Sequence, residues 1–375
     1  MLDRRKLVMG AAALTVPSRL VRAALPYEWQ ATDEGFAPGF GARLDQFILS
    51  GEARNVHCVI VARRGRLVAE RYYEGEDQVR NGSGRARVEH VAFDAERPHE
   101  LRSVSKSIVG LLYGVALDAG KVPPLDAPLL AQFPQYTDLP DMWQRQRWTI
   151  KHAMTMTLGM DWNEDLSYAD PRNSQTAMEA APDPYRYALE QPIVALAGER
   201  WIYSAGATAL IGKLIEKGVG HAIHDYARGV LFDRLGLGPT ECRIGRDGET
   251  NFASGLAMRP RDLARIGQML IDGGKADGLQ VVPAMWLEDS FNPAVRINDR
   301  RQYGYHWYLS DALLERPEGR RRERMIAAFG NGGQRLFVFP GLDLVVVVTA
   351  GNYNSRDQGV GPARVLNDVV LPNLR

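Results

Sequence analysis

Two residues at the start of an apolar stretch have the types and spacing needed for nucleophilic catalysis. The sequence Ser103-Val104-Ser105-Lys106 stands directly before apolar residues that recur at helical spacing. A spacing of three places Ser103 and Lys106 on one helical face, where the positive end of the helix dipole favours a developing oxyanion. A serine hydroxyl needs a base to take its proton, and a buried lysine can take it or keep a neighbouring base ionised. The tetrapeptide alone is equally compatible with a capped helix and an exposed lysine.

Other catalytic patterns are missing from the chain. It has no Gly-x-Ser-x-Gly elbow and no Walker loop. His99 is followed by Ser103, and not by a second histidine, at the position that a zinc protease would need. His221 and His224 have a spacing that can hold a metal, but two histidines on an exposed helix are better explained as solvated residues. We therefore expect no metal and no cofactor.

Residues 99–110 (HELRSVSKSIVG) resemble the nucleophile segment of the serine beta-lactamase-like, penicillin-recognising hydrolases. This family also includes esterases and amide hydrolases such as 6-aminohexanoate-dimer hydrolase, the branch closest in motif. Four more segments match the family in the same order, at residues 158–162, 201–206, 254–264 and 329–334. The likeness spans roughly residues 40–354, and an ordered set of motifs is far more specific than any one of them.

The resemblance assigns roles to individual residues. It implies that Ser103 is the acylated nucleophile, Lys106 its activating partner and Tyr203 the second general base. A tyrosine with an ordinary pKa near 10 acts as a base only if positive charge keeps it partly ionised, and Lys106 is the expected source of that charge. The backbone N–H groups of Ser103 and Gln334 are the expected oxyanion hole.

Two departures from the family affect this interpretation. The family places an asparagine two residues after the tyrosine, but this chain has Ala205 there, so we expect an altered acyl-group pocket. Glu164 is not part of the Glu-x-x-Leu-Asn pattern that supplies a deacylating glutamate in class A enzymes. Deacylation would then depend on Tyr203 and Lys106.

A third departure concerns the acyl side of the substrate. Beta-lactamases and peptidases carry Lys-Thr-Gly or Lys-Ser-Gly where this chain has Asn331-Gly332-Gly333. The family's lysine helps to hold the substrate's carboxylate, so its loss argues against beta-lactams and peptidoglycan stems and favours a neutral acyl side. The candidates for contact with substrate are Asn331, Gly332, Gly333, Trp162, Tyr168, Asp170 and Trp307.

The surrounding pattern predicts an α+β protein. Residues 56–62 and 66–73 indicate one β-hairpin, and residues 335–339 and 342–349 indicate a second. Helical periodicity dominates between them. We expect the beta-lactamase/transpeptidase-like fold that the resemblance implies: a sheet lobe of residues 24–105 and 255–375, flanked by helices, and a mainly helical lobe of residues 106–254.

Composition limits the classes of function. The 375 residues are 45% hydrophobic and 24% charged with a net charge of +1, which is typical of a globular protein and gives no basis for binding nucleic acid. Cys58 and Cys242 cannot form a disulfide framework, although one bridge between them stays open.

The N-terminus has the pattern of a secretory signal. Arg4, Arg5 and Lys6 precede an apolar stretch and a small-residue site before Ala24. We interpret residues 1–23 as a signal peptide of the twin-arginine type and expect a periplasmic or secreted protein without a membrane span. The alternative is a cytoplasmic protein with a short basic N-terminus.

Three functional hypotheses follow. The first is a secreted serine hydrolase that cleaves small esters or amides through an acyl-enzyme on Ser103. The second is a beta-lactamase or D-Ala-D-Ala carboxypeptidase, which Asn331 and Ala205 disfavour. The third is a catalytically inactive binding protein on the same fold, which the intact set of Ser103, Lys106 and Tyr203 disfavours. The oligomeric state does not follow from the sequence.

Overall fold

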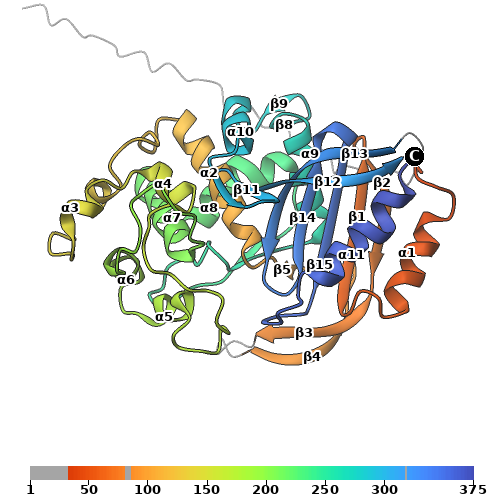
Figure 1. Cartoon of the computed structure of the whole chain (residues 1–375), viewed down its shortest axis with the longest axis horizontal. Helices are drawn as coiled ribbons and strands as arrows, with labels where there is room; N and C mark the ends of the chain where they lie inside the picture. Colours follow the sequence, from red (N-terminus) through yellow and green to blue (C-terminus); the bar gives the residue numbers. More distant parts are fainter. Residues whose placement is uncertain (1–32, 81–85, 317–318) are drawn as a thin grey trace, which may run out of the picture.

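An eight-stranded antiparallel sheet forms the centre of the fold in the computed structural model, which describes residues 33–80, 86–316 and 319–375 (Figure 1). Its strands, in order across the sheet, are β10 (Val295–Asn298), β11 (Arg301–Tyr303), β12 (Tyr308–Arg316), β13 (Gly319–Gly330), β14 (Gln334–Phe339), β15 (Leu344–Ala350), β1 (Val56–Arg63) and β2 (Arg66–Tyr72). Both predicted hairpins, β1–β2 and β14–β15, are present. Because β1 also pairs with β15, the sheet contains strands from both ends of the chain, as predicted. Every residue of β1 and β15 is buried, which explains their nearly continuous apolar sequences.

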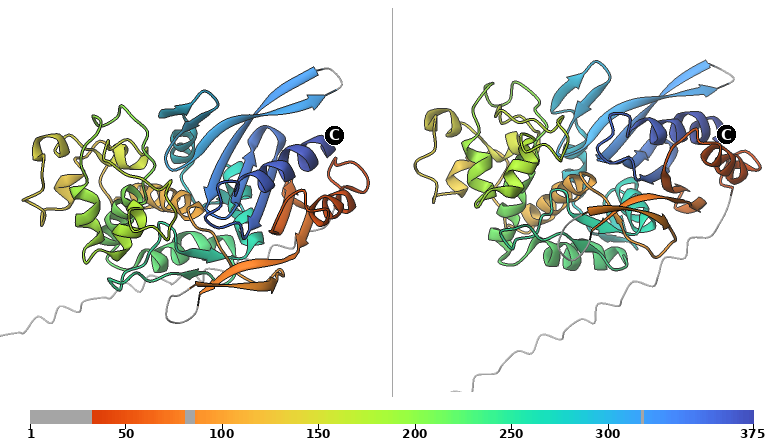
Figure 2. Two further views of the ribbon diagram at one scale, coloured as in Figure 1. Left: turned by 60° about the horizontal axis from the view of Figure 1, so that its bottom comes forward. Right: turned by 90° about the horizontal axis from the view of Figure 1, so that it is seen from below.

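Helices cover both faces of this sheet. On one face, α1 (Phe40–Leu49) packs with the C-terminal helices α11 (Val360–Arg364), η5 (Val365–Val370) and η6 (Leu371–Asn373), so the two ends of the described chain lie together (Figure 2). On the other face lie α9 (Pro260–Ile271) and the first part of α2 (Val104–Asp118). Gly267 lets α9 approach closely, because a Cβ atom there would lie 2.6 Å from Val345.

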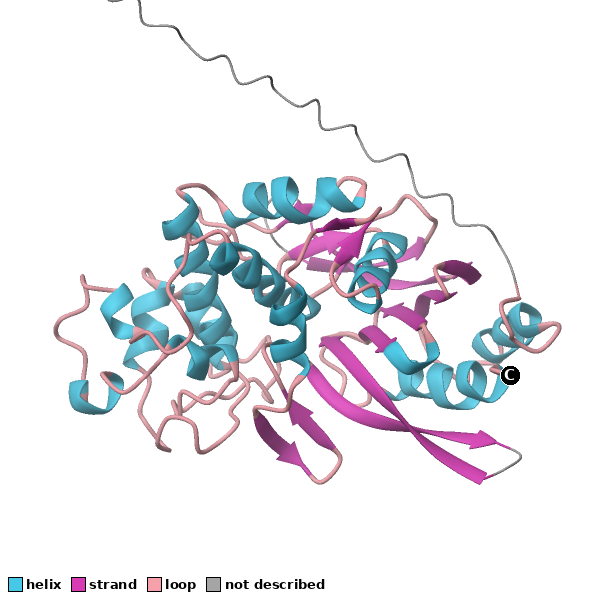
Figure 3. Ribbon diagram, turned by 90° about the horizontal axis from the view of Figure 1, so that it is seen from above, coloured by secondary structure: helices cyan, strands magenta, loops and turns pink. Residues whose placement is uncertain are grey.

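The segment between α2 and the later strands is mainly helical (Figure 3). It contains η1 (Leu130–Gln132), α3 (Met142–Arg145), α4 (Ile150–Met154), α5 (Ser174–Ala180), α6 (Pro184–Glu190), α7 (Ala205–Val219), α8 (Ile223–Ala227), η2 (Arg228–Phe232) and η3 (Asp233–Leu235). Helix α7 packs against α2 and α4. Helix α10 (Ala284–Phe291) brings Trp286 onto α2 at Gly114, where a Cβ atom would lie 2.2 Å from the indole ring. Helix α2 therefore contacts the sheet at one end and the other helices along its length.

Several short strands lie outside the main sheet. They are β3 (Glu74–Arg80) paired with β4 (Ala86–Ala92), β5 (His99–Glu100) with β7 (Leu256–Met258) and β6 (Glu241–Cys242), and β8 (Lys275–Ala276) with β9 (Leu279–Gln280). The β3–β4 hairpin extends along the edge of the molecule (Figure 2). The sequence did not predict it, because many of its residues are polar or charged and few are apolar at the alternating positions that mark a strand.

Three expectations about the whole chain have different outcomes. The predicted signal peptide, residues 1–23, lies outside the described residues. Cys58 and Cys242 are both free thiols, so the bridge that was left open does not form. Within the described part of the chain, no helix combines the length and apolar character that crossing a membrane would require.

Candidate active site

The predicted nucleophile lies at a strained turn between β5 and α2. Ser103 is the N-cap residue of α2, and Arg102 before it adopts a left-handed conformation with φ of 51°. This conformation costs a side-chain-bearing residue on the order of 1–3 kcal/mol, so neighbouring contacts must hold it. Arg102 forms a 2.7 Å ion pair with Glu100 and stacks on Tyr353, with its guanidinium carbon 4.5 Å from the ring centroid. The turn thereby presents Ser103 at the end of the helix.

Lys106 lies directly beneath the nucleophile. Its Nζ donates to Ser103 Oγ at 3.1 Å and to the backbone oxygen of Ala253 at 3.2 Å, and its side chain is 1% exposed. Burial lowers the pKa of Lys106, because an ammonium group loses its hydration there. The spacing of three residues therefore brings serine and lysine together as predicted. The contribution of the Ala253 carbonyl was missed, although it directly precedes a segment that matches the family.

Tyr203 completes the group, on the loop that leads into α7. The backbone N–H of Ile202 bonds to the carbonyl of Met156 at 2.8 Å, and Ser204 caps α7 through Ala207 N at 3.1 Å, so both neighbours of the tyrosine are fixed. The Nζ atom of Lys106 lies 5.1 Å from the centroid of the Tyr203 ring. The structure therefore places all three predicted catalytic residues together.

The ionisation of Tyr203 differs from the expectation. Burial raises the pKa of its phenol well above 10, and the nearby Tyr308 and Glu164 raise it further. Lys106 faces the aromatic ring, and after burial the groups that raise the pKa of the phenol are Tyr308, Glu164, Tyr303 and Tyr168. This direction is opposite to the one expected from Lys106, so the role of second general base stays a prediction. A neutral phenol can donate a hydrogen bond or a proton, and this is its form before the reaction begins.

Glu164 is a member of the site whose contribution sequence analysis did not recognise. Its Oε1 accepts hydrogen bonds from Trp162 Nε1 and from the backbone N–H of Ala205, both at 2.6 Å, and its Oε2 accepts from Tyr168 at 3.2 Å. Its charge raises the pKa of both Lys106 and Tyr203. The carboxylate thus anchors the backbone at Ala205, the position where the family carries asparagine. No spacing rule links residues 41 positions apart, so sequence offered no signal for this contact.

A second carboxylate, Glu179, also influences the pKa of the lysine. Glu179 accepts hydrogen bonds at 2.8 Å each from Gln175, Arg243 and Asn251. Burial raises its pKa, but Arg243 and the two amide donors lower it more, so Glu179 stays below the usual carboxyl value. The ionised group raises the pKa of Lys106 and opposes part of the effect of burial.

A cleft of about 860 Å³ opens beside Ser103. Among the residues that line it are Arg102, Ser103, Tyr168, Glu179, Ser254 and Asn331. Tyr168 and Asn331 are therefore placed at the cleft, as candidates for substrate contact should be. Trp162 is instead buried against α7, with its indole bonded to Glu164. Trp307 is fully buried with its ring edge-on to Phe291, so it offers no surface to a substrate.

The turn between β13 and β14 leads into Gln334, the predicted oxyanion-hole residue, and has an unusual backbone conformation. Gly332 and Gly333 have φ of 91° and 104°, values that favour glycine, and a Cβ atom on Gly332 would lie 2.5 Å from the Tyr353 ring. The buried side chain of Gln334 holds the turn through Ala350, donating to its oxygen at 2.6 Å and accepting from its N–H at 3.1 Å. Asn331 accepts from Asn354 N at 3.1 Å and lines the cleft from the turn between β13 and β14.

Comparisons with known proteins identify the family of the chain. The beta-lactamase family model matches residues 44–368, and the chain belongs to that family. A 6-aminohexanoate-dimer hydrolase from Paenarthrobacter ureafaciens is 26% identical over 282 residues, which cover 68% of this chain and 67% of that protein.

Two solved structures share the fold. A class C beta-lactamase mutant superimposes with a TM-score of 0.64 at 16% identity, covering 91% of this chain and 100% of that one. EstCE1, a hydrolase with promiscuous acyltransferase activity, gives 0.67 at 16% identity and covers 90% and 99%. The protein is a serine hydrolase of the beta-lactamase family with its α+β fold.

Proposed function

We propose that this hydrolase cleaves small esters or amides through an acyl-enzyme on Ser103. The observation that carries the proposal is the 3.1 Å contact between Ser103 Oγ and a buried Lys106 with a lowered pKa. The neutral form of Lys106 takes the hydroxyl proton as Ser103 Oγ attacks the substrate carbonyl. The backbone N–H groups of Ser103 and Gln334 stabilise the oxyanion.

The departure of the leaving group, which completes the acyl-enzyme, uses the protonated tyrosine. When the tetrahedral intermediate collapses, the bond to the alkoxide or amine leaving group breaks, and Tyr203 supplies the proton that this group needs. Lys106, which holds the proton taken from Ser103, returns one to the phenolate. Water then attacks the acyl-enzyme with the same residues in the reverse roles and releases the acid. Glu164 acts as a positioning residue, because it anchors the backbone of Ala205 and sets the charge around Tyr203 and Lys106.

The loss of the family's lysine favours neutral groups on the leaving-group side and not on the acyl side, because the carboxylate of a beta-lactam or a D-Ala-D-Ala stem belongs to the amine that leaves. Asn331 stands where beta-lactamases and peptidases carry a lysine, and Arg102, one of the cations that line the cleft, is paired with Glu100 at 2.7 Å. A substrate carboxylate would therefore meet an already neutralised charge. This favours uncharged esters and amides over beta-lactams. The name of the relative from Paenarthrobacter ureafaciens makes 6-aminohexanoate dimer, whose leaving amine carries a carboxylate, the amide substrate that tests this preference.

The decisive experiment compares wild type with Ser103→Ala. We expect wild type to release p-nitrophenol from p-nitrophenyl acetate with a transient acetyl adduct in the intact mass, and Ser103→Ala to show neither. Ser105→Ala is the matched control, since its hydroxyl lies in the same turn but contacts Leu256 N instead of Lys106. A parallel panel of 6-aminohexanoate dimer and a chromogenic cephalosporin separates amidase from beta-lactamase. Turnover that persists in Ser103→Ala would overturn the proposal.

We also propose a periplasmic or secreted location, based on the signal pattern in residues 1–23. Cell fractionation of the full chain should recover mature protein outside the cytoplasm, beginning near Ala24. An Arg4→Lys, Arg5→Lys double variant should retain the precursor if export uses the twin-arginine route. Full-length protein confined to the cytoplasm would contradict the proposal.

A further inference from the structure

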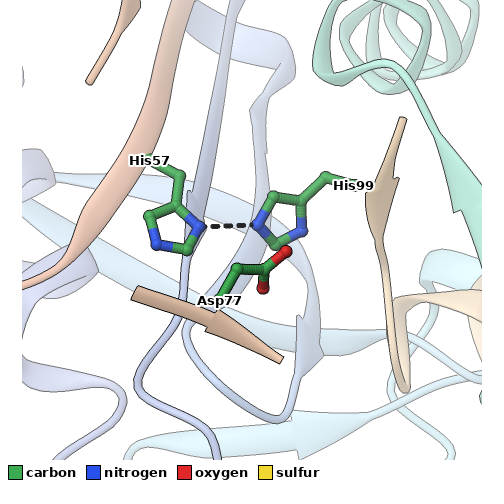
Figure 4. A group of neighbouring side chains, drawn as sticks. All are labelled: His57, Asp77 and His99. Atoms are coloured by element: carbon green, nitrogen blue, oxygen red, sulfur yellow. Dashed lines mark hydrogen bonds between the residues drawn. The ribbon is translucent and has the colours of Figure 1, made fainter. Parts of the chain in front are cut away.

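A second cluster of polar residues lies behind the nucleophile segment, formed by strands β1, β3 and β5. His57, Asp77 and His99 each place a nitrogen or oxygen within 4.8 Å of the others (Figure 4). The two imidazoles are 0% and 2% exposed, and His57 Nδ1 lies 2.9 Å from His99 Nε2. The catalytic mechanism uses none of these residues. Their arrangement therefore needs a separate explanation.

The outer nitrogen of His57 must carry a hydrogen. His57 Nε2 lies 3.1 Å from the backbone oxygen of Glu76 and 3.2 Å from Asn55 Oδ1, which are both acceptors. The orientation of the Asn55 amide is fixed, because Oδ1 accepts from Glu76 N and Nδ2 donates to Glu76 O, each at 2.9 Å. In a neutral imidazole only one nitrogen carries a proton. The Nδ1 atom of His57 therefore presents a lone pair.

The outer nitrogen of His99 is fixed in the same way. His99 Nδ1 lies 3.0 Å from the backbone oxygen of Glu100, an acceptor, and so carries the hydrogen. Its Nε2 then also presents a lone pair. Two neutral imidazoles would thus face each other with two lone pairs at 2.9 Å, a repulsive contact. A cation between the rings removes this repulsion, and the Asp77 carboxylate beside them adds negative charge.

The hydrogen bonds of the outer nitrogens leave the two inner nitrogens in the state that a metal site needs. An imidazole with one N–H and one lone pair is the form in which histidine binds metals. The Asp77 carboxylate has an oxygen within 4.8 Å of both rings and supplies negative charge for a divalent cation.

The outer contacts also match those of a metal centre. Metal-binding histidines usually donate the other ring N–H to a carbonyl or carboxylate, and ligating carboxylates usually accept a hydrogen bond. His57 donates to Glu76 O, His99 donates to Glu100 O, and Asp77 accepts from the Tyr353 hydroxyl at 3.0 Å. Each of the three proposed ligands thus has a hydrogen-bond partner that fixes its orientation.

We propose that His57, Asp77 and His99 form a binding site for a divalent transition-metal ion, Zn²⁺ in the first place. Two nitrogens and one carboxylate oxygen form a common zinc donor set, with water as the fourth ligand. Tetrahedral bonds of about 2.0–2.1 Å would separate the two nitrogens by roughly 3.3 Å, so the rings need to move apart by a few tenths of an ångström. The ion would join β1, β3 and β5, and His99 lies four residues before Ser103. The site would therefore anchor the nucleophile segment from behind.

The experiment is a metal titration of the chelator-treated full chain. We expect calorimetry with ZnCl₂ to give one equivalent with a dissociation constant in the micromolar range or below, and the melting temperature to rise until that equivalent is bound. Asp77→Asn and His99→Gln should each weaken binding at least tenfold. The matched control is His224→Gln, whose ring bonds to Thr240 Oγ1 at 3.0 Å, far from the cluster in sequence, and it should bind as wild type does.

The results of this metal titration are independent of the results of the activity assays. Ser103→Ala should bind Zn²⁺ normally, so a failure of the proposed catalysis does not affect this test. His99 is buried and its variant could misfold, whereas Asp77 is only partly buried and keeps the test valid. Folded wild type that shows no saturable binding would overturn the proposal. Undiminished binding by both cluster variants would also overturn it, because the ion would then bind elsewhere.

Discussion

The active site and the histidine cluster share one short segment, which carries both His99 and Ser103. The two regions differ in the hydrogen-bond partners of their buried nitrogen atoms. In the active site, the buried Lys106 has neutral partners, Ser103 Oγ and the oxygen of Ala253, with carboxylates acting from further away. In the cluster, His57 and His99 have their outer nitrogens satisfied while their inner nitrogens face each other. In the first region burial lowers the pKa of Lys106 and produces a base beside a nucleophile. In the second region the hydrogen bonds of the outer nitrogens leave two lone pairs facing each other, the arrangement from which we propose the metal site.

The largest expected effect on turnover is that of Lys106→Met. Removing the base should lower kcat/KM for p-nitrophenyl acetate about a thousandfold, the usual range for general-base catalysis. The melting temperature should stay level or rise, because methionine fills similar space without a buried amine to desolvate. Zn²⁺ affinity should not change. Lys151→Met, at an exposed lysine, is the control, and a loss of less than tenfold in Lys106→Met would contradict the assigned role.

The next largest effect is expected from Glu164→Gln, with a turnover reduced about tenfold as the charge around Tyr203 changes. Activity should rise with pH as Lys106 loses its proton. The rising limb of the pH–activity profile should lie below the ordinary lysine pKa, because burial lowers the pKa of Lys106. The Glu164 carboxylate raises the pKa of Lys106, so its removal should shift the limb to lower pH. Kinetics across the pH range test this, with Asp165→Asn as the control. A shift to higher pH would contradict the electrostatic argument.

A smaller change is expected for Asn331→Ala. This side chain lines the cleft and accepts from Asn354 N, so its loss should raise KM severalfold and leave kcat nearly unchanged. The lost hydrogen bond should lower the free energy of unfolding by about 1 kcal/mol. Steady-state kinetics with acetate and butyrate esters measure the first effect. A fall in kcat at constant KM would place Asn331 in the chemical step instead of in substrate binding.

The smallest effect on turnover, within about twofold, is expected for Gly75→Ala, which acts on the other region. A Cβ atom there would lie 2.4 Å from Asn55 Oδ1 and 2.8 Å from the His57 ring. Overpacking of this kind costs about 1–3 kcal/mol and should displace His57, which would weaken Zn²⁺ binding. Gly229→Ala, where a Cβ atom meets nothing within 4 Å, is the control for calorimetry and thermal unfolding. Equal Zn²⁺ affinity in both variants would show that His57 is not part of the metal site.

The two regions also differ in how much of them could be predicted. Ser103 and Lys106 lie within one helical turn, where the backbone hydrogen-bonding pattern fixes their relative position, so their spacing alone indicated the contact. His57, Asp77 and His99 lie on three separate strands. Their proximity depends on how the largely polar β3–β4 hairpin packs beside the main sheet, and no periodicity in the sequence encodes that packing. The expectation of no metal came from searching for local spacings, which such a cluster lacks.

The sequence by itself determined the two hairpins, the sheet built from both ends, the nucleophile helix and the family, because these depend on local periodicity and on an ordered set of motifs. Only the tertiary structure decided the protonation of Tyr203, the place of Glu164 at Ala205 and the burial of Trp307. Each of these depends on the dielectric environment and on charges brought from distant parts of the chain. Burial and long-range electrostatics arise only when the chain is packed, so a residue's identity does not reveal its ionisation or its accessibility.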